Sequence, residues 1–178
     1  MSKRNGQRPD TVDEIIAAWA VTRPGLDVSA MEVFGRLHRS FLLYREQIAD
    51  RFEELGTNVA GFDVMAALRR APEFRMSAGD LAHQTLVTTG GLTLRVRKLE
   101  AAGLVRRTRD TVDNRVVHVQ LTDAGRELVD RVADEHFANL ARMLDGLTPR
   151  AQDDLADQLS LLEASLHAAA PGLEPREA

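Results

Sequence analysis

Cysteine is absent from this chain of 178 residues, and aromatic residues make up only 4% of it. Without cysteine, the protein forms no disulfide, uses no thiolate nucleophile and senses no oxidant through a thiol. So few aromatic rings argue against a surface that binds single-stranded nucleic acid by stacking on its bases. The chain also lacks an apolar run long enough for a membrane helix and a recognisable secretory signal. We therefore expect a cytoplasmic protein with no membrane partner.

The signatures of enzymes and metal sites are missing as well. The sequence contains no phosphate-binding loop, nucleophile elbow or zincin motif, and its carboxylates are scattered along expected helix faces. The five histidines do not have the spacing of metal ligands. These residues are His38, His83, His118, His136 and His167. The sequence therefore predicts neither an enzyme nor a protein with a metal or another cofactor.

The most informative segment that is present runs from residue 113 to residue 125. Val117 and Val119 alternate with polar residues, at the period of two that is typical of a half-buried strand. After the strand, Thr122 is expected to cap a helix, with Asp123 in its first turn. Residues 104–109 supply a partner strand, which places Arg115 at or near the tip of a basic hairpin. Such an arginine suits the narrow minor groove of A·T-rich DNA, where negative potential is concentrated.

Residues 77–103, which precede the hairpin, carry a helix-turn-helix pattern. Ser77 begins a short helix with a capping box completed by Asp80, and Gly103 ends a second helix that Thr88 or Thr89 can cap. The apolar stripe of the second helix consists of Leu92, Val96 and Leu99. The opposite side, which would meet bases and phosphates, carries Thr89, Gly90, Thr93, Leu94, Arg97 and Lys98. A helix-turn-helix followed by a basic hairpin predicts a winged helix.

The distribution of charge agrees with DNA binding, although the net charge of the chain is −4. Residues 95–115 hold seven basic and three acidic residues, whereas the rest of the chain holds 16 basic and 24 acidic residues. The positive charge therefore coincides with the expected helix and hairpin, and the acidic remainder would orient the protein on a duplex.

With these motifs the chain resembles the multiple-antibiotic-resistance regulator (MarR) family of bacterial transcription factors. The resemblance covers residues 28–166. It is carried by Leu99-Glu100-Ala101-Ala102-Gly103-Leu104-Val105, Asp113-x-Arg115 and Leu121-Thr122-x-x-Gly125. The resemblance implies a DNA-binding transcriptional regulator. It also implies a repressor, because repression is usual in this family. Asn114 departs from the family, because a second basic residue is common there. Leu94 also departs, because it can contact a thymine methyl group but reads no hydrogen-bond pattern.

The helix, its cap and the hairpin together predict the residues that contact double-stranded DNA. These are Thr88, Thr89, Gly90, Thr93, Leu94, Arg97, Lys98, Arg109 and Arg115.

Long amphipathic helices flank the winged helix and are expected to form a homodimer, as in the resembled family. Ser29 opens a capping box for a helix that would end at Gly56, and Thr148-Pro149 opens a helix near the other end of the chain. That last helix carries a stripe of leucines at positions 155, 159, 162 and 166. Two copies would place two recognition helices one DNA turn apart, so the operator should be a pseudo-palindrome.

A further helix is expected over residues 10–26, opened by a capping box that starts at Thr11. This helix carries a tryptophan, and with it the chain resembles the urate-responsive subgroup of the family, in which a Trp, an Asp and two Arg define a ligand pocket. The resemblance assigns these roles to Trp19, Asp63, Arg95 and Arg107. An aromatic ring stacks on a flat heterocycle and arginine pairs with an anionic oxygen, so urate or a related purine is the favoured ligand.

Other interpretations of the same residues remain open. Regulators that answer to aconitate-like polycarboxylates share the additional helix, so a tricarboxylate or an aromatic carboxylate is an alternative small anionic ligand. Trp19 can equally be a packing residue, and Asp63 with Arg95 can form a purely structural ion pair. An architectural DNA-binding protein without a ligand is a further alternative.

The predicted architecture is mainly α-helical, with a small β-hairpin wing. It comprises a winged helix-turn-helix lobe over residues 57–122 and a helical dimerisation region over residues 28–56 and 123–170. The additional helix occupies residues 10–26, and tails are expected at residues 1–9, which are basic, and 171–178.

Overall fold

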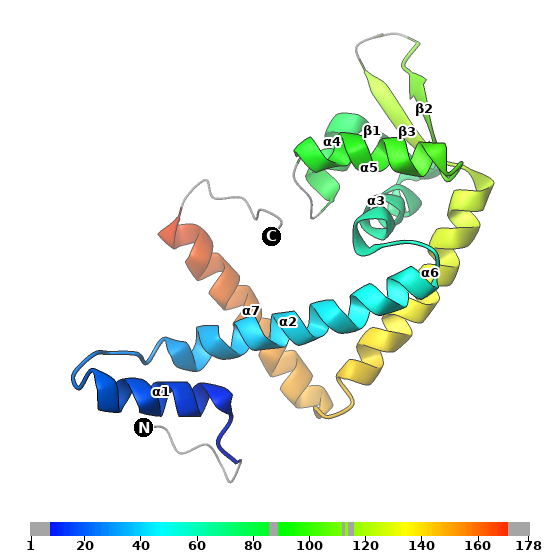
Figure 1. Ribbon diagram of the computed structural model, residues 1–178. Helices are drawn as coiled ribbons and strands as arrows, with labels where there is room; N and C mark the ends of the chain where they lie inside the picture. Colours follow the sequence, from blue (N-terminus) through cyan, green and yellow to red (C-terminus); the bar gives the residue numbers. More distant parts are fainter. Residues whose placement is uncertain (1–7, 86–88, 112, 114–115, 171–178) are drawn as a thin grey trace. The chain divides into compact units, whose positions relative to one another are not determined.

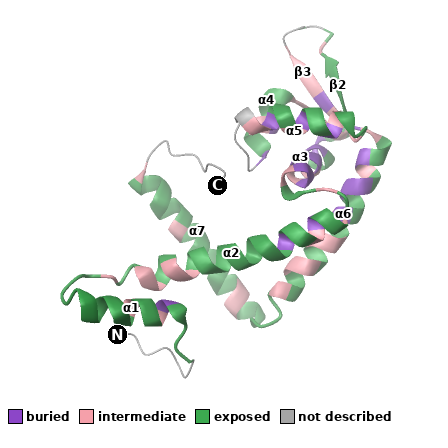
Figure 2. Cartoon of the chain, in the orientation of Figure 1, coloured by how far each residue is buried: buried purple, intermediate pink, exposed green. Residues whose placement is uncertain are grey.

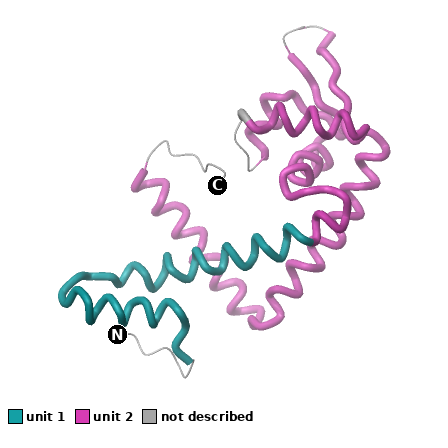
Figure 3. The backbone as a smooth tube through the Cα atoms, in the orientation of Figure 1, with its two compact units in different colours: residues 1–50 teal, residues 51–178 magenta. Residues whose placement is uncertain are grey.

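The computed structural model describes residues 8–85, 89–111, 113 and 116–170 (Figure 1). The chain divides into two compact units, residues 1–50 and 51–178, and each is considered by itself (Figure 3). The elements follow one another as α1 (Thr11–Thr22), α2 (Met31–Glu54), α3 (Val59–Arg70), the 3-10 turn η1 (Pro72–Phe74), β1 (Arg75–Ser77), α4 (Ala78–Gln84), α5 (Thr89–Ala101), β2 (Val105–Arg109), β3 (Val117–Leu121), α6 (Asp123–Met143) and α7 (Pro149–Ala169).

The prediction of a mainly helical fold with a small β wing is confirmed. The sheet nevertheless has three antiparallel strands, in the order β1-β3-β2, where the sequence predicted only the hairpin of β2 and β3. The short strand β1 joins the other edge of β3, with Arg75 opposite Gln120 and Ser77 opposite His118. A segment of three residues is too short to show alternation, and Ser77 at its end already serves as the N-cap of α4.

The core of the second unit is centred on α3. Val64, Met65 and Leu68 of this helix are completely buried. They are surrounded by α4, α5, α6 and the inner face of the sheet. Further buried side chains come from α4, β3 and α6, namely Leu81, Val119, Val129 and Val132. Asn58 caps the start of α3 by accepting a hydrogen bond from the Gly61 amide at 2.8 Å. The core therefore fixes the helices and the sheet that carry the predicted DNA contacts.

In the first unit, α1 lies beside the start of α2 (Figure 1). The predicted capping box at Thr11 is wrong by one residue, because Asp10 is the N-cap and exchanges hydrogen bonds with Asp13. The backbone amides of this capping box lower the pKa values of Asp10 and Asp13 below their usual range, and Arg36 of α2, which donates to both carboxylates, lowers them further. Val12 is buried, and a Cβ on Gly35 would lie 2.9 Å from it, so α1 approaches α2 closely.

The start of α2 also differs from the prediction. The helix begins at Met31, and the Ser29 amide donates to the Asp27 carboxylate at 2.9 Å, which forms a turn before the helix. Along the first half of α2 the large apolar side chains are exposed, including Phe34, Leu37 and Phe41.

The two last helices begin where the sequence predicts. Thr122 caps α6 through the Gly125 amide, and Thr148 caps α7 through the Ala151 amide, with Pro149 in the first turn. No residue of α7 is buried in the single chain (Figure 2). Its leucines at positions 155, 159 and 166 are each about 45% exposed. This helix therefore presents an apolar stripe that the described residues of its own unit do not cover.

Candidate DNA-binding surface

The helix-turn-helix is built from α4, the following turn and α5. Ser77 caps α4 by accepting from the Asp80 amide at 3.0 Å, and its hydroxyl donates to the Asp80 carboxylate at 2.7 Å. The end of α4 is fixed by Thr85, which is buried and donates its hydroxyl to the Leu81 carbonyl at 3.0 Å. Thr88, predicted as a possible cap of α5, lies outside the described residues.

The helix α5 has the two faces that the sequence predicts. Leu92, Val96 and Leu99 are each less than 10% exposed, and the helix packs against α3 and β2. Thr89 and Gly90 form the first residues of the helix. The opposite face is exposed and carries Thr93, Leu94, Arg97 and Lys98. Because Leu94 is 57% exposed, it supplies an apolar group on an otherwise polar face.

The wing follows α5 after a tight turn. Gly103 has a φ of +73°, a conformation that glycine adopts without strain, and it directs the chain from α5 into β2. β2 and β3 then pair from Val105 opposite Leu121 to Arg109 opposite Val117. Arg115, the predicted minor-groove contact, lies outside the described residues.

The basic side chains of this region fall into two groups. Arg97, Lys98 and Arg109 are exposed and lie on α5 or at the end of β2. Arg106 instead donates to the Gln120 side chain at 2.9 and 3.2 Å. Arg107 pairs with Glu100 of α5 at 2.6 Å, and this contact holds the pKa of the Glu100 carboxyl below its usual range. The second group thus joins the strands and α5 to one another.

A cavity of about 400 Å³ lies between the start of α3 and α5. Its lining combines Thr57 and Asn58 with Arg95 and Lys98. The Arg95 guanidinium lies back along α5 toward Gly91, where an added Cβ would be 3.7 Å from its Cζ atom. Of the residues predicted to bind a ligand, Arg95 is therefore the one that lines this cavity.

The other three residues predicted to bind a ligand are placed differently. Asp63 is half-buried on α3, and Arg107 forms the ion pair with Glu100. Trp19 belongs to the first unit, where it is 42% exposed on α1. The assignment of all four residues to one ligand stays a prediction.

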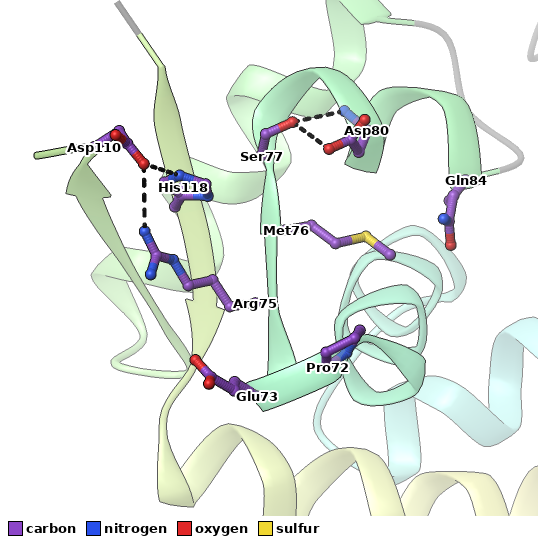
Figure 4. A pocket seen from close by; sticks show the side chains of 9 residues that line it. All are labelled: Pro72, Glu73, Arg75, Met76, Ser77, Asp80, Gln84, Asp110 and His118. Atoms are coloured by element: carbon purple, nitrogen blue, oxygen red, sulfur yellow. Dashed lines mark hydrogen bonds and ion pairs between the residues drawn. The ribbon is translucent and has the colours of Figure 1, made fainter. Parts of the chain in front are cut away.

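The outer face of the sheet carries a polar cluster that the sequence analysis did not identify. It borders a cavity of about 470 Å³ and includes Arg75, Asp110 and His118, which come from three different segments (Figure 4). The Asp110 carboxylate lies 2.8 Å from His118 Nε2 and 4.0 Å from the Arg75 guanidinium. Only the pairing of β1 with β3 brings Arg75 here, so no local pattern could have indicated the cluster.

The described part of the chain has neither a metal-ligand cluster nor a membrane-spanning helix. No three of its His, Asp and Glu side chains are grouped as metal ligands. None of its helices is both long and apolar enough to cross a membrane.

The exposed face of α5 beside a charged two-stranded wing defines a winged helix-turn-helix DNA-binding protein. The profile of the MarR family matches residues 55–115. The transcriptional regulator PecS of Dickeya dadantii is 34% identical over 157 residues, which are 87% of this chain and 94% of that protein. The chain belongs to the MarR family and is a DNA-binding transcriptional regulator, not an enzyme.

Solved structures of DNA-binding proteins share the fold. Sco3205 of Streptomyces coelicolor, a MarR family regulator in complex with DNA, aligns with a TM-score of 0.73 and 23% identity, covering 83% of this chain and 95% of that one. BpsR of Bordetella bronchiseptica, whose DNA binding is regulated by 6-hydroxynicotinic acid, aligns with a TM-score of 0.70 and 22% identity over 78% of this chain and 98% of that one.

Proposed function

We propose that the protein represses transcription by binding a pseudo-palindromic operator as a homodimer, and that a small anionic ligand releases it. The observation that carries the proposal is the exposed face of α5, with Arg97 and Lys98, next to a wing whose strand β2 ends at the exposed Arg109. A polar helix face and a charged hairpin suit the major groove and the adjacent minor groove.

The proposed dimer is supported by the uncovered leucines of α7 and by the exposed apolar residues at the start of α2. Each set recurs at helical spacing and would lose water on association. A symmetric pair presents two α5 helices to successive turns of a duplex, which is why the operator should be a pseudo-palindrome.

The operator proposal is tested by titrating the full chain against duplexes from the DNA that flanks its own gene, with fluorescence anisotropy as the readout. Saturable binding to one palindrome, at two chains per duplex, is the expected result. Equal affinity for all duplexes would instead support an architectural DNA-binding protein, and no binding at all would overturn the proposal.

For the ligand, we favour urate or a related purine, with an aconitate-like polycarboxylate or an aromatic carboxylate as the alternative. The cavity beside α3 supports an anionic ligand because Arg95 and Lys98 line it, and arginine can pair with an anionic oxygen in a bidentate manner. Trp19, Asp63, Arg95 and Arg107 are the proposed binding residues. A ligand that binds the free protein ten times more tightly than the DNA-bound form supplies about 1.4 kcal/mol of coupling.

The ligand proposal is tested by adding urate, aconitate and salicylate to the protein–operator complex while Trp19 fluorescence is recorded. Urate should quench the fluorescence and release the DNA. Trp19→Phe removes the single tryptophan, so DNA release is the readout for this variant. It should weaken the release of DNA by urate without changing operator affinity in the absence of ligand. Asp63→Ala should change operator affinity even without ligand. Release by aconitate or salicylate alone would favour the alternative ligands, and indifference to all three would leave Trp19 as a packing residue.

A further inference from the structure

On the outer face of the sheet, polar side chains form hydrogen bonds between neighbouring strands. Near the base of the wing, Gln120 of the central strand β3 accepts from Arg106 of β2 and donates to the Glu73 carbonyl, just before β1, at 3.1 Å. Nearer the tip, His118 of β3 lies between Ser77 of β1 and Thr108 of β2 in the strand register. Two levels of cross-strand contact therefore exist, and Asp110 occupies the outer one.

The Asp110 carboxylate connects three segments of the chain at this level. Its Oδ2 atom lies 2.8 Å from His118 Nε2 and 4.0 Å from the Arg75 guanidinium, and its Oδ1 atom accepts from the Asp113 amide at 3.2 Å. The side chains of Arg75 and His118 both point toward it (Figure 4). His118 is only 19% exposed, so this contact is partly shielded from water.

This contact lies where the wing loses its third strand. The pairing of β1 with β3 ends at Ser77 opposite His118, whereas the pairing of β2 with β3 continues to Arg109 opposite Val117. Outward from the Ser77–His118 pair, the described wing is a ribbon of two strands that ends at the Arg109–Val117 pair. Such ribbons are marginally stable in water and vary widely in twist, so their direction must be fixed by other contacts.

We propose that Asp110 is a positioning residue for DNA binding, which holds the wing at the angle that brings Arg109 to the duplex. The carboxylate does so by joining Arg75 of β1 to His118 of β3 and by bonding the Asp113 amide of the wing loop. This inference rests on the proposed operator binding. It assigns to Asp110 an effect through the wing and no contact with DNA.

The direction of the change in DNA affinity on removal of Asp110 distinguishes a positioning role from simple charge repulsion. A carboxylate near the phosphates repels them, so its removal by itself should tighten DNA binding. If Asp110 positions the wing, Asp110→Ala should instead weaken binding to the full operator by roughly tenfold. Asp110→Asn, which keeps one of the two oxygens and so can still accept from the Asp113 amide, should recover part of this loss.

The matched control is Asp130→Ala. Asp130 lies on α6 in the same unit and pairs with Arg69 at 2.8 Å, so this substitution removes the same charge and also breaks an ion pair, but leaves the wing intact. It should not weaken operator binding. A shorter duplex, which lacks the base pairs outside the two recognition-helix sites, provides the second control. The wings have no DNA to contact on this duplex, so the wild-type protein and Asp110→Ala should bind it equally.

Amide hydrogen exchange of the free protein gives a readout that does not depend on DNA. In Asp110→Ala the amides of residues 110 and 116, which donate to the Val116 and Asp113 carbonyls at 2.9 Å in the wild-type wing, should exchange roughly tenfold faster, while amides of the α3 core stay protected. Unchanged exchange in the wing, or unchanged or tighter operator binding, would overturn the inference. If wild-type protein binds no palindrome, the proposed operator function fails, and the exchange measurement still decides whether Asp110 holds the wing. If Asp110→Ala does not fold, His118→Ala replaces it in both measurements.

Discussion

At the scale of single residues, His136 on α6 is a titratable side chain packed among aromatic rings. Its ring packs against Phe52 and Phe62, with centroid distances of 5.0 and 5.4 Å. Burial among these rings lowers the pKa of His136 below its ordinary value of 6.5, because the charged imidazolium loses hydration that the rings do not replace.

The free energy of unfolding should therefore fall as the pH is lowered through about 6.5. In this range the unfolded chain takes up a proton at His136 that the folded protein does not, so protons favour unfolding. His136→Phe should remove this part of the pH dependence in urea unfolding at pH 7.5 and 5.5. His83→Gln, which changes an exposed histidine of α4, should keep it. If the free energy of unfolding fell equally between pH 7.5 and 5.5 in the wild-type and His136→Phe proteins, His136 would not be the source of this pH dependence.

At the scale of elements, the start of α6 is docked against the turn between α5 and β2. The Thr122 hydroxyl donates to the Gly103 carbonyl at 2.7 Å and accepts from the Gly125 amide at 3.1 Å. Gly125 is buried, and a Cβ at this position would lie 2.0 Å from the Leu104 carbonyl oxygen. The motif Leu121-Thr122-x-x-Gly125 thus combines a helix cap with a close approach of two backbones.

Gly125→Ala should destabilise the protein by about 2–3 kcal/mol, because backbone atoms must move to admit the methyl group. The matched control is Gly79→Ala in α4, where the nearest atom to an added Cβ is Ser77 Oγ at 3.8 Å. That substitution should be neutral or stabilise by up to about 1 kcal/mol through helix propensity. Thermal or urea unfolding compares the two, and a Gly125→Ala protein as stable as Gly79→Ala would refute the close-approach argument.

At the scale of the whole molecule, the uncovered stripe of α7 should determine the oligomeric state. Leu159→Glu places a charge on this stripe and should convert a dimer to a monomer in analytical ultracentrifugation, with operator affinity reduced at least tenfold because one recognition helix is lost. Leu161→Glu makes the same change on the opposite side of the helix, where the wild-type side chain is 64% exposed, and should leave the dimer intact. A dimer that survives Leu159→Glu would exclude α7 as the interface.

DNA affinity should also depend steeply on salt. If Arg97, Lys98 and Arg109 of both copies each neutralise a phosphate, the slope of log affinity against log salt is about −5, at roughly −0.9 per phosphate. Arg97→Ala should make the slope shallower by about 2. A slope near zero in the wild-type protein would contradict a phosphate-binding role for this surface.

Local sequence determined the parts of this protein that depend on neighbours along the chain. The caps at Ser77, Thr122 and Thr148 and the stop at Gly103 are where the sequence places them, because each satisfies backbone groups within a few residues. The two-faced α5 followed by the β2–β3 hairpin is also readable as a pattern, and it suffices to identify a winged helix.

Tertiary structure decided what depends on residues far apart in the chain. The N-cap of α1 is Asp10, to which Arg36 of α2 donates a hydrogen bond, and not Thr11 as the local sequence predicted. The strand β1 exists because β3 offers it an edge, and this pairing alone brings Arg75 to Asp110 and His118. Side-chain contacts between strands that are distant in the chain leave no periodic pattern in the sequence. The contacts of Asp110 with Arg75 and His118 are therefore visible only in the folded structure.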